Sequence, residues 1–109
     1  MAVAYKVLGQ LAPGAAALTA IYTVPAATQA VVSSIVVCNR SAVATAFRIS
    51  VAVAGAADAN QQYVAFDVPI GGNQIVTYTV GIGLATTDVV RVFNTLATCS
   101  FNVFGTEIT

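Results

Sequence analysis

The run AVVSSIVVC at residues 30–38 most constrains how this chain can fold. β-Branched residues dominate the run, and such residues favour strands. Apolar side chains occupy both alternating sets of positions, with Val31, Ile35 and Val37 in one set and Val32, Val36 and Cys38 in the other. A strand that is apolar on both faces is usually covered on both sides. We therefore predict a central strand here, covered by a second layer of the chain or by a partner subunit.

A second strand signal follows at residues 47–53, where apolar and small or polar residues alternate strictly. This period of two predicts a half-buried strand with Phe47, Ile49, Val51 and Val53 facing inward. The same reasoning applied to residues 62–68 predicts a strand with Val64, Phe66 and Val68 facing inward.

The remaining sequence repeats this pattern of short strand and turn. Strands are expected at residues 4–9, 18–24, 30–38, 47–53, 62–68, 75–80, 89–93 and 99–104, with Gly81 and Gly83 ending the sixth. Parallel strands need long, usually helical crossovers, and no helical periodicity is visible. The sequence thus predicts an all-β fold, a single antiparallel β-sandwich or jelly-roll-like barrel of about eight strands, in one domain over residues 1–109.

The composition bounds the partners of the chain. Charged residues make up 7% and the net charge is zero, so direct nucleic-acid binding, which needs clustered positive charge, is not expected. No apolar run is long enough for a membrane-spanning helix, and no basic leader precedes an apolar segment, so a product of the cytoplasm without a membrane partner is expected. A surface so poor in charge favours a homo-oligomer; the alternative is a neutral surface wetted by Thr, Ser and Asn.

Few residues suggest chemistry. The chain has no histidine and two cysteines, which leaves too few ligands for a zinc site, and we predict no enzyme activity, no cofactor and no metal. Asp88 is expected to cap a turn, and Asp67 to face solvent or pair with an arginine. Cys38 and Cys99 are expected to be free, the alternative being a disulfide that forms after release from the cell. An enzyme would need a convergent pocket such as Asp67, Arg48 and Arg91.

Ordered motifs along the chain resemble a known family. They are YKVLGQ at residues 5–10, YTVPAAT at 22–28, VCNR at 37–40, FRI at 47–49, the strand at 63–68, DVVRV at 88–92 and FGTEIT at 104–109. Together they resemble small β-sandwich proteins encoded in the structural-gene modules of tailed bacteriophages. The resemblance implies a virion structural protein, foremost a capsid decoration (cement) protein that is made in the host cytoplasm and binds the major capsid protein or other virion proteins on the outer head surface.

Decoration proteins of this kind commonly form trimers at local threefold axes, and a trimer is the expected oligomer here. The doubly apolar strand then becomes a candidate interface through Val32 and Val36. Arg40, Arg48 and Arg91 are further candidates, because arginine is enriched at interfaces; for each, the alternative is a local carboxylate or carbonyl partner.

Two other functions stay open. The first is a tail, neck or baseplate position within the virion. The second is a carbohydrate-binding module, since β-sandwiches host such sites, and its one hint is Tyr63 beside the polar residues 60–62.

Overall fold

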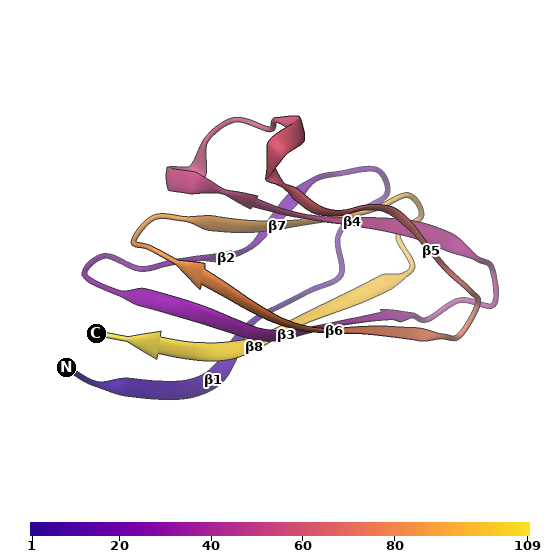
Figure 1. Ribbon diagram of the computed structural model, residues 1–109. Coiled ribbons are helices and arrows are strands. Elements are labelled where there is room, and N and C mark those ends of the chain that lie inside the picture. The colour runs from indigo at the N-terminus through magenta and orange to yellow at the C-terminus, as the bar shows by residue number, and fades with distance from the viewer.

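The computed structural model describes residues 1–109 and confirms the all-β prediction. Eight strands pack as two four-stranded antiparallel sheets (Figure 1). One sheet, the β1 sheet, has the order β1-β8-β3-β6, and the other, the β2 sheet, has the order β2-β7-β4-β5. The strands are β1 (Val3–Leu11), β2 (Thr19–Thr23), β3 (Gln29–Asn39), β4 (Thr45–Ala52), β5 (Tyr63–Ile70), β6 (Ile75–Leu84), β7 (Val89–Asn94) and β8 (Cys99–Ile108).

The hydrophobic core lies between the two sheets. Phe47 of β4 and Phe101 of β8 are fully buried there, and their rings meet edge to face with centroids 6.0 Å apart. Tyr78 of β6 contacts Phe47 in the same manner. Edge-to-face contacts of this kind stabilise a core beyond the area that they bury, so these aromatic residues join the two sheets.

The strand predicted around residues 30–38 is central, because β3 pairs with both β8 and β6. The predicted alternation within it is wrong in its first half. A shift of register between Val32 and Ser34 places Val32 inward together with Ile35, while Val31 faces outward and is 38% exposed. A bulge adds an unpaired residue and so reverses which face later side chains occupy. The outer face of β3 therefore borders solvent in the protomer.

Two predicted inward faces also need correction. Val64 and Phe66 of β5 point outward, and Ala65 and Ile70 are buried instead. Asp67 has a φ of 50°, a left-handed conformation that Asp tolerates, and the pairing with β4 shifts there. Val53 is also exposed, because β4 ends at Ala52 and the chain turns into a 3₁₀ turn, Val53–Gly55.

The connection between β4 and β5 stands on the outer side of the β2 sheet (Figure 1). It contains the 3₁₀ turns Val53–Gly55 and Asn60–Gln62, and these contact β7 and β4 respectively. Ser50 and Ala52 of β4, on the outer side of that sheet, are fully buried. The loop thus covers part of a face that alternation alone would leave exposed.

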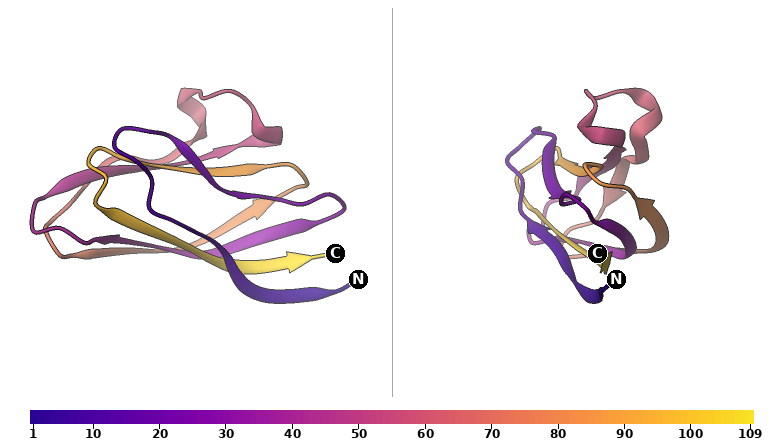
Figure 2. Two further views of the ribbon diagram at one scale, coloured as in Figure 1. Left: turned by 180° about the vertical axis from the view of Figure 1, so that it is seen from behind. Right: turned by 90° about the vertical axis from the view of Figure 1, so that its left-hand side faces the viewer.

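The molecule is elongated, measuring 45 × 27 × 19 Å. The first and last strands pair along one edge of the molecule, and the backbones of Ala2 and Thr109 exchange two hydrogen bonds of 3.0 and 2.9 Å. Both termini consequently lie side by side at one end (Figure 2). No helix in the structure could cross a membrane.

Candidate interaction surfaces

Each of the three arginines that the sequence singled out has a partner within the chain. Arg91 donates to the carbonyl oxygens of Ala56 at 2.8 Å and Gly55 at 3.2 Å. Arg40 donates to the carbonyl oxygen of Ala97 at 3.5 Å. The local alternative therefore holds for both side chains, and Arg91 in particular fastens the β4–β5 loop to β7.

Arg48 forms the most elaborate of these contacts. Its Nε and Nη2 atoms donate to the two carboxylate oxygens of Asp67 at 2.7 and 3.3 Å. Its guanidinium also lies 4.1 Å from the ring centroid of Phe66 and 4.3 Å from that of Phe93. A planar guanidinium suits a forked carboxylate contact and aromatic stacking together. The Asp67 carboxylate raises the pKa of Arg48 above its usual value.

Tyr63 extends this cluster toward the β4–β5 loop. Its ring meets Phe66 edge to face at 5.0 Å, and burial, followed by the hydrogen-bonded carboxylate of Asp58, raises its pKa. Asn60, Tyr63 and Phe66 line an open hollow of about 380 Å³. The sequence indicated only Tyr63 here, because Arg48, Phe66 and Phe93 come from three strands that only the sheet pairing brings together.

The two valines proposed as interface residues differ in position. Val32 is fully buried between the sheets, so it offers no surface to a partner, and its candidacy is withdrawn because the bulge in β3 turns it inward. Val36 is half-buried on the outer side of β3. It remains accessible beside Asn102 and Thr77, its neighbours on β8 and β6.

The outer face of the β1 sheet carries no charged side chain. The positions that alternate with the buried ones are Val3, Tyr5, Val7 and Gln10 on β1, Ser100, Asn102, Phe104, Thr106 and Ile108 on β8, Gln29, Val31, Ser34, Val36 and Cys38 on β3, and Ile75, Thr77, Thr79, Gly81 and Gly83 on β6. Every charged residue lies elsewhere. A surface that repels no neighbour by charge can approach another protein without the cost of burying an unpaired ion.

Apolar residues gather at one end of this face, and we name them the outer patch. Tyr5 is 85% exposed, and Val3 and Val7 follow at 49% and 46%. The members are Val3, Tyr5, Val7, Val31, Phe104 and Ile108, which are joined by the pairing of β1 and β3 with β8. Contiguous exposed apolar groups on one sheet face commonly mark a site of protein–protein contact.

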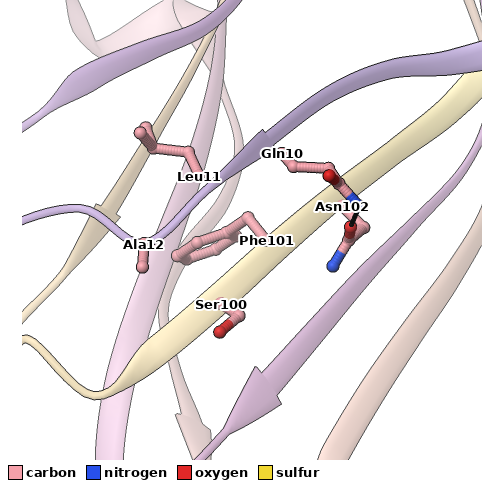
Figure 3. Close-up of a pocket in the computed structure, with 6 residues that line it drawn as sticks. All are labelled: Gln10, Leu11, Ala12, Ser100, Phe101 and Asn102. Carbon is pink, nitrogen blue, oxygen red and sulfur yellow. Dashed lines mark hydrogen bonds between the residues drawn. The ribbon is translucent and has the colours of Figure 1, made fainter.

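A shallow hollow of about 360 Å³ lies where β1 ends and β8 begins, next to the outer patch (Figure 3). The side chains of Gln10 and Asn102 point toward each other there, and Gln10 Nε2 donates to Asn102 Oδ1 at 2.7 Å. Ser100, Leu11, Ala12 and Phe101 complete the lining. Its polar groups are amides and a hydroxyl, so the hollow offers hydrogen bonds but no charge.

One ionic cluster joins the sheets near the termini. Glu107 accepts hydrogen bonds from Lys6 Nζ at 2.8 Å and from the Tyr22 hydroxyl at 2.6 Å. These two bonds lower the pKa of Glu107. Burial, and then the Glu107 carboxylate, raise the pKa of Tyr22. The Glu107 carboxylate thus binds one cation, Lys6, and one hydroxyl donor, Tyr22, so the polar groups of the cluster are paired within the chain, as is usual for a structural contact.

The two cysteines and Asp88 lie at separate places in the fold. Cys38 and Cys99 are both free; their registers put Cys38 on the outer face of β3 and Cys99 in the core. Burial raises the pKa of the Cys99 thiol. Asp88 caps its turn as expected, with Oδ2 accepting from the N–H of Ala85 at 3.0 Å. No group of three His, Cys, Asp or Glu side chains converges in a way that could hold a metal ion.

Comparison with known proteins does not assign the chain to a family. No protein-family model matches the chain, and no curated protein matches it at a significant level.

Proposed function

We propose that the chain is a bacteriophage virion structural protein that decorates the outer surface of the capsid and stabilises the shell. The observation that carries this proposal is the outer patch on an uncharged sheet face, with Tyr5 85% exposed on the edge strand β1. Such a face suits burial against another protein. The motif resemblance to β-sandwich proteins of tailed phages supports the choice of a virion partner. The role needs no catalytic residue.

The fold supplies what such a role requires mechanically. The outer patch lies on three strands that are hydrogen-bonded along their length, so little conformational freedom is lost when it binds. The major capsid protein is the proposed partner, with the patch lying across a joint between its subunits. A specific interface of standard size buries about 1,600 Å² in total. Repetition of one modest contact over a shell opposes expansion of the whole shell.

The position within the virion is tested by labelling particles with an antibody. Antibody raised against the purified protein is applied to particles released by cells that carry this gene, and bound gold is located by electron microscopy. Label spread over the head is expected. Label confined to the tail, neck or one vertex favours the alternative position within the virion, and the absence of label from every particle contradicts a virion role.

A second candidate function, carbohydrate binding, is favoured by one observation. Phe66 is 54% exposed beside Tyr63 and Asn60, and Asp67 is 47% exposed at its side chain. Aromatic faces next to polar acceptors suit a sugar, which has apolar faces and hydroxyl edges. A glycan array probed with wild-type protein and with Phe66→Ala tests this role. Binding that Phe66→Ala abolishes supports it, and an array without binding contradicts it.

A further inference from the structure

The two sheets have four edge strands, and one of them, β6, has fewer of the features that block pairing with another chain than the other three. Soluble proteins protect sheet edges with short strands, charges, prolines or bulges. β2 has only five residues, β1 carries Lys6, and β5 carries Pro69 and the positive φ of Asp67. β6 is ten residues long, with the sequence IVTYTVGIGL. It contains no charge, no proline and no residue with positive φ, and its one irregularity is a shift of register against β3 between Thr79 and Ile82.

The flank of the sandwich next to β6 is also open. β1 packs on β2 at the opposite flank. Beside β6, a small cavity of about 40 Å³ opens between the sheets, and every residue that lines it is apolar: Ile35, Ile49, Val64, Ala65, Tyr78, Val80 and Ile82. The inward side chains of β6 from Val76 to Ile82 are only half-buried, since no strand lies beyond them. An added strand would complete both the hydrogen-bond ladder and the apolar lining.

We propose that β6 pairs with β6 of a second copy of this chain, antiparallel and about a twofold axis at Thr79. The exposed and half-buried positions of β6 alternate without interruption from Ile75 to Gly83. Antiparallel partners directly opposite each other share a face. Centring the pair on Thr79 puts Thr79 opposite its own copy, Thr77 opposite Gly81, and Ile75 opposite Gly83 on the outer face. Val76 then faces Ile82, and Tyr78 faces Val80, on the inner face.

This register accounts for side chains that the protomer leaves uncovered. Ile75 is 65% exposed, and Gly83, which would lie opposite it, has open space around its Cβ position. Opposed threonines are a favourable cross-strand pair. The inner pairs extend the apolar lining into the partner, and the two β1 sheets become one continuous eight-stranded sheet.

A second copy suits this edge by charge. A strand with ionic side chains would bury unpaired charge against the apolar flank, whereas β6 itself brings none. Ten residues span roughly 33 Å and the sheets lie about 10 Å apart, so two copies bury on the order of 700 Å² besides the new hydrogen bonds. That is a small interface, and the dimer is therefore expected to depend on protein concentration. This twofold contact differs from the trimer that the family resemblance implies.

Cysteine cross-linking tests the axis directly. In a Cys38→Ser background, Thr79→Cys places two cysteines opposite each other at a Cα separation of about 4.5–5.5 Å, within disulfide range. Thr77→Cys is the matched control, because its two copies lie roughly 13 Å apart in this register, four residues along the partner strand. We expect at least tenfold more covalent dimer from Thr79→Cys under mild oxidation. Equal yields, or no dimer from Thr79→Cys at millimolar concentration, would overturn the proposal.

A charge variant tests the contact without a covalent trap. Thr79→Lys sets like charges opposite each other at the axis, while Gln10→Lys adds the same charge to an exposed position on β1. Sedimentation equilibrium should show dimer in the wild type and in Gln10→Lys, and monomer in a folded Thr79→Lys. A dimer that survives Thr79→Lys contradicts the proposal.

The pairing of β6 and the virion role can each fail alone. A protein that is monomeric in solution but labels capsids refutes the pairing and leaves the virion role standing. A protein that forms the dimer but is absent from virions refutes the virion role and leaves the pairing standing.

Discussion

The Asp88 carboxylate accepts a hydrogen bond of 2.9 Å from the backbone N–H of Ala54, 34 positions earlier in the chain. The second oxygen of Asp88 accepts from Ala85 within its own turn. One buried side chain thereby ties the turn before β7 to the start of the β4–β5 loop. Ala54 has a φ of 53°, so this contact also supports a backbone conformation that alanine disfavours.

Removing the Asp88 carboxylate should destabilise the fold strongly. Asp88→Ala leaves two backbone N–H groups without their acceptor, and hydrogen bonds to charged groups contribute roughly 1.5–3 kcal/mol each. We expect a loss of about 3 kcal/mol in the free energy of unfolding, measured in urea. Asp88→Asn keeps one acceptor and should lose about half as much. Equal stability of Asp88→Ala and the wild type would show that the loop is held by other contacts.

Arg48 should not be replaceable by lysine. Arg48→Lys keeps the charge but loses the forked contact with Asp67 and the planar stacking between Phe66 and Phe93. A loss of about 1 kcal/mol in the free energy of unfolding is expected. Arg40→Lys is the control, since Arg40 makes one long hydrogen bond at an exposed position. Similar stabilities for the two variants would mean that charge alone accounts for the role of Arg48.

The Glu107 cluster predicts a pH dependence of stability. Hydrogen bonds from Lys6 and Tyr22 lower the pKa of Glu107 in the folded protein, so the folded state binds the proton less readily than the unfolded state. The resulting stabilisation is present above the unfolded pKa of about 4.3 and is lost as the pH falls through the folded pKa. Glu107→Gln should therefore reduce the loss in the free energy of unfolding that the wild type shows as the pH is lowered into the acid range. A profile unchanged by Glu107→Gln would contradict this role.

Gly105 should not tolerate even alanine. A Cβ atom there would lie 2.0 Å from the carbonyl oxygen of Val31 and 2.9 Å from a methyl group of Leu8, and backbone cannot move aside cheaply. Gly105→Ala is expected to cost about 3 kcal/mol. Gly83→Ala, on an edge strand with open space at its Cβ position, should leave the stability of dilute protein nearly unchanged. Chemical unfolding of the two variants side by side distinguishes the two effects. Gly105→Ala reports the clash of the added Cβ atom with its neighbours, and Gly83→Ala reports only the change in strand propensity.

Residue pattern was enough to predict the sandwich and its eight strands, because β-branched runs and turn residues are local signals. The face of the sheet on which each side chain lies was predicted less well. The register shift at Val32 and the positive φ of Asp67 depend on neighbouring strands, and the burial of Ser50 depends on a loop folding over the sheet. The cluster of Arg48, Phe66 and Phe93 likewise exists only once β4, β5 and β7 have paired.

Binding of the purified protein to capsids that lack it tests the proposed role most directly. Cosedimentation should show saturable binding by the wild type. Tyr5→Asp should bind at least tenfold more weakly, because it places a charge within the outer patch, where Tyr5 is 85% exposed and contributes little to the fold. Val53→Asp, which is 70% exposed just after β4 in the other sheet, should bind like the wild type. Undiminished binding by a folded Tyr5→Asp, or no binding by the wild type, would contradict the account.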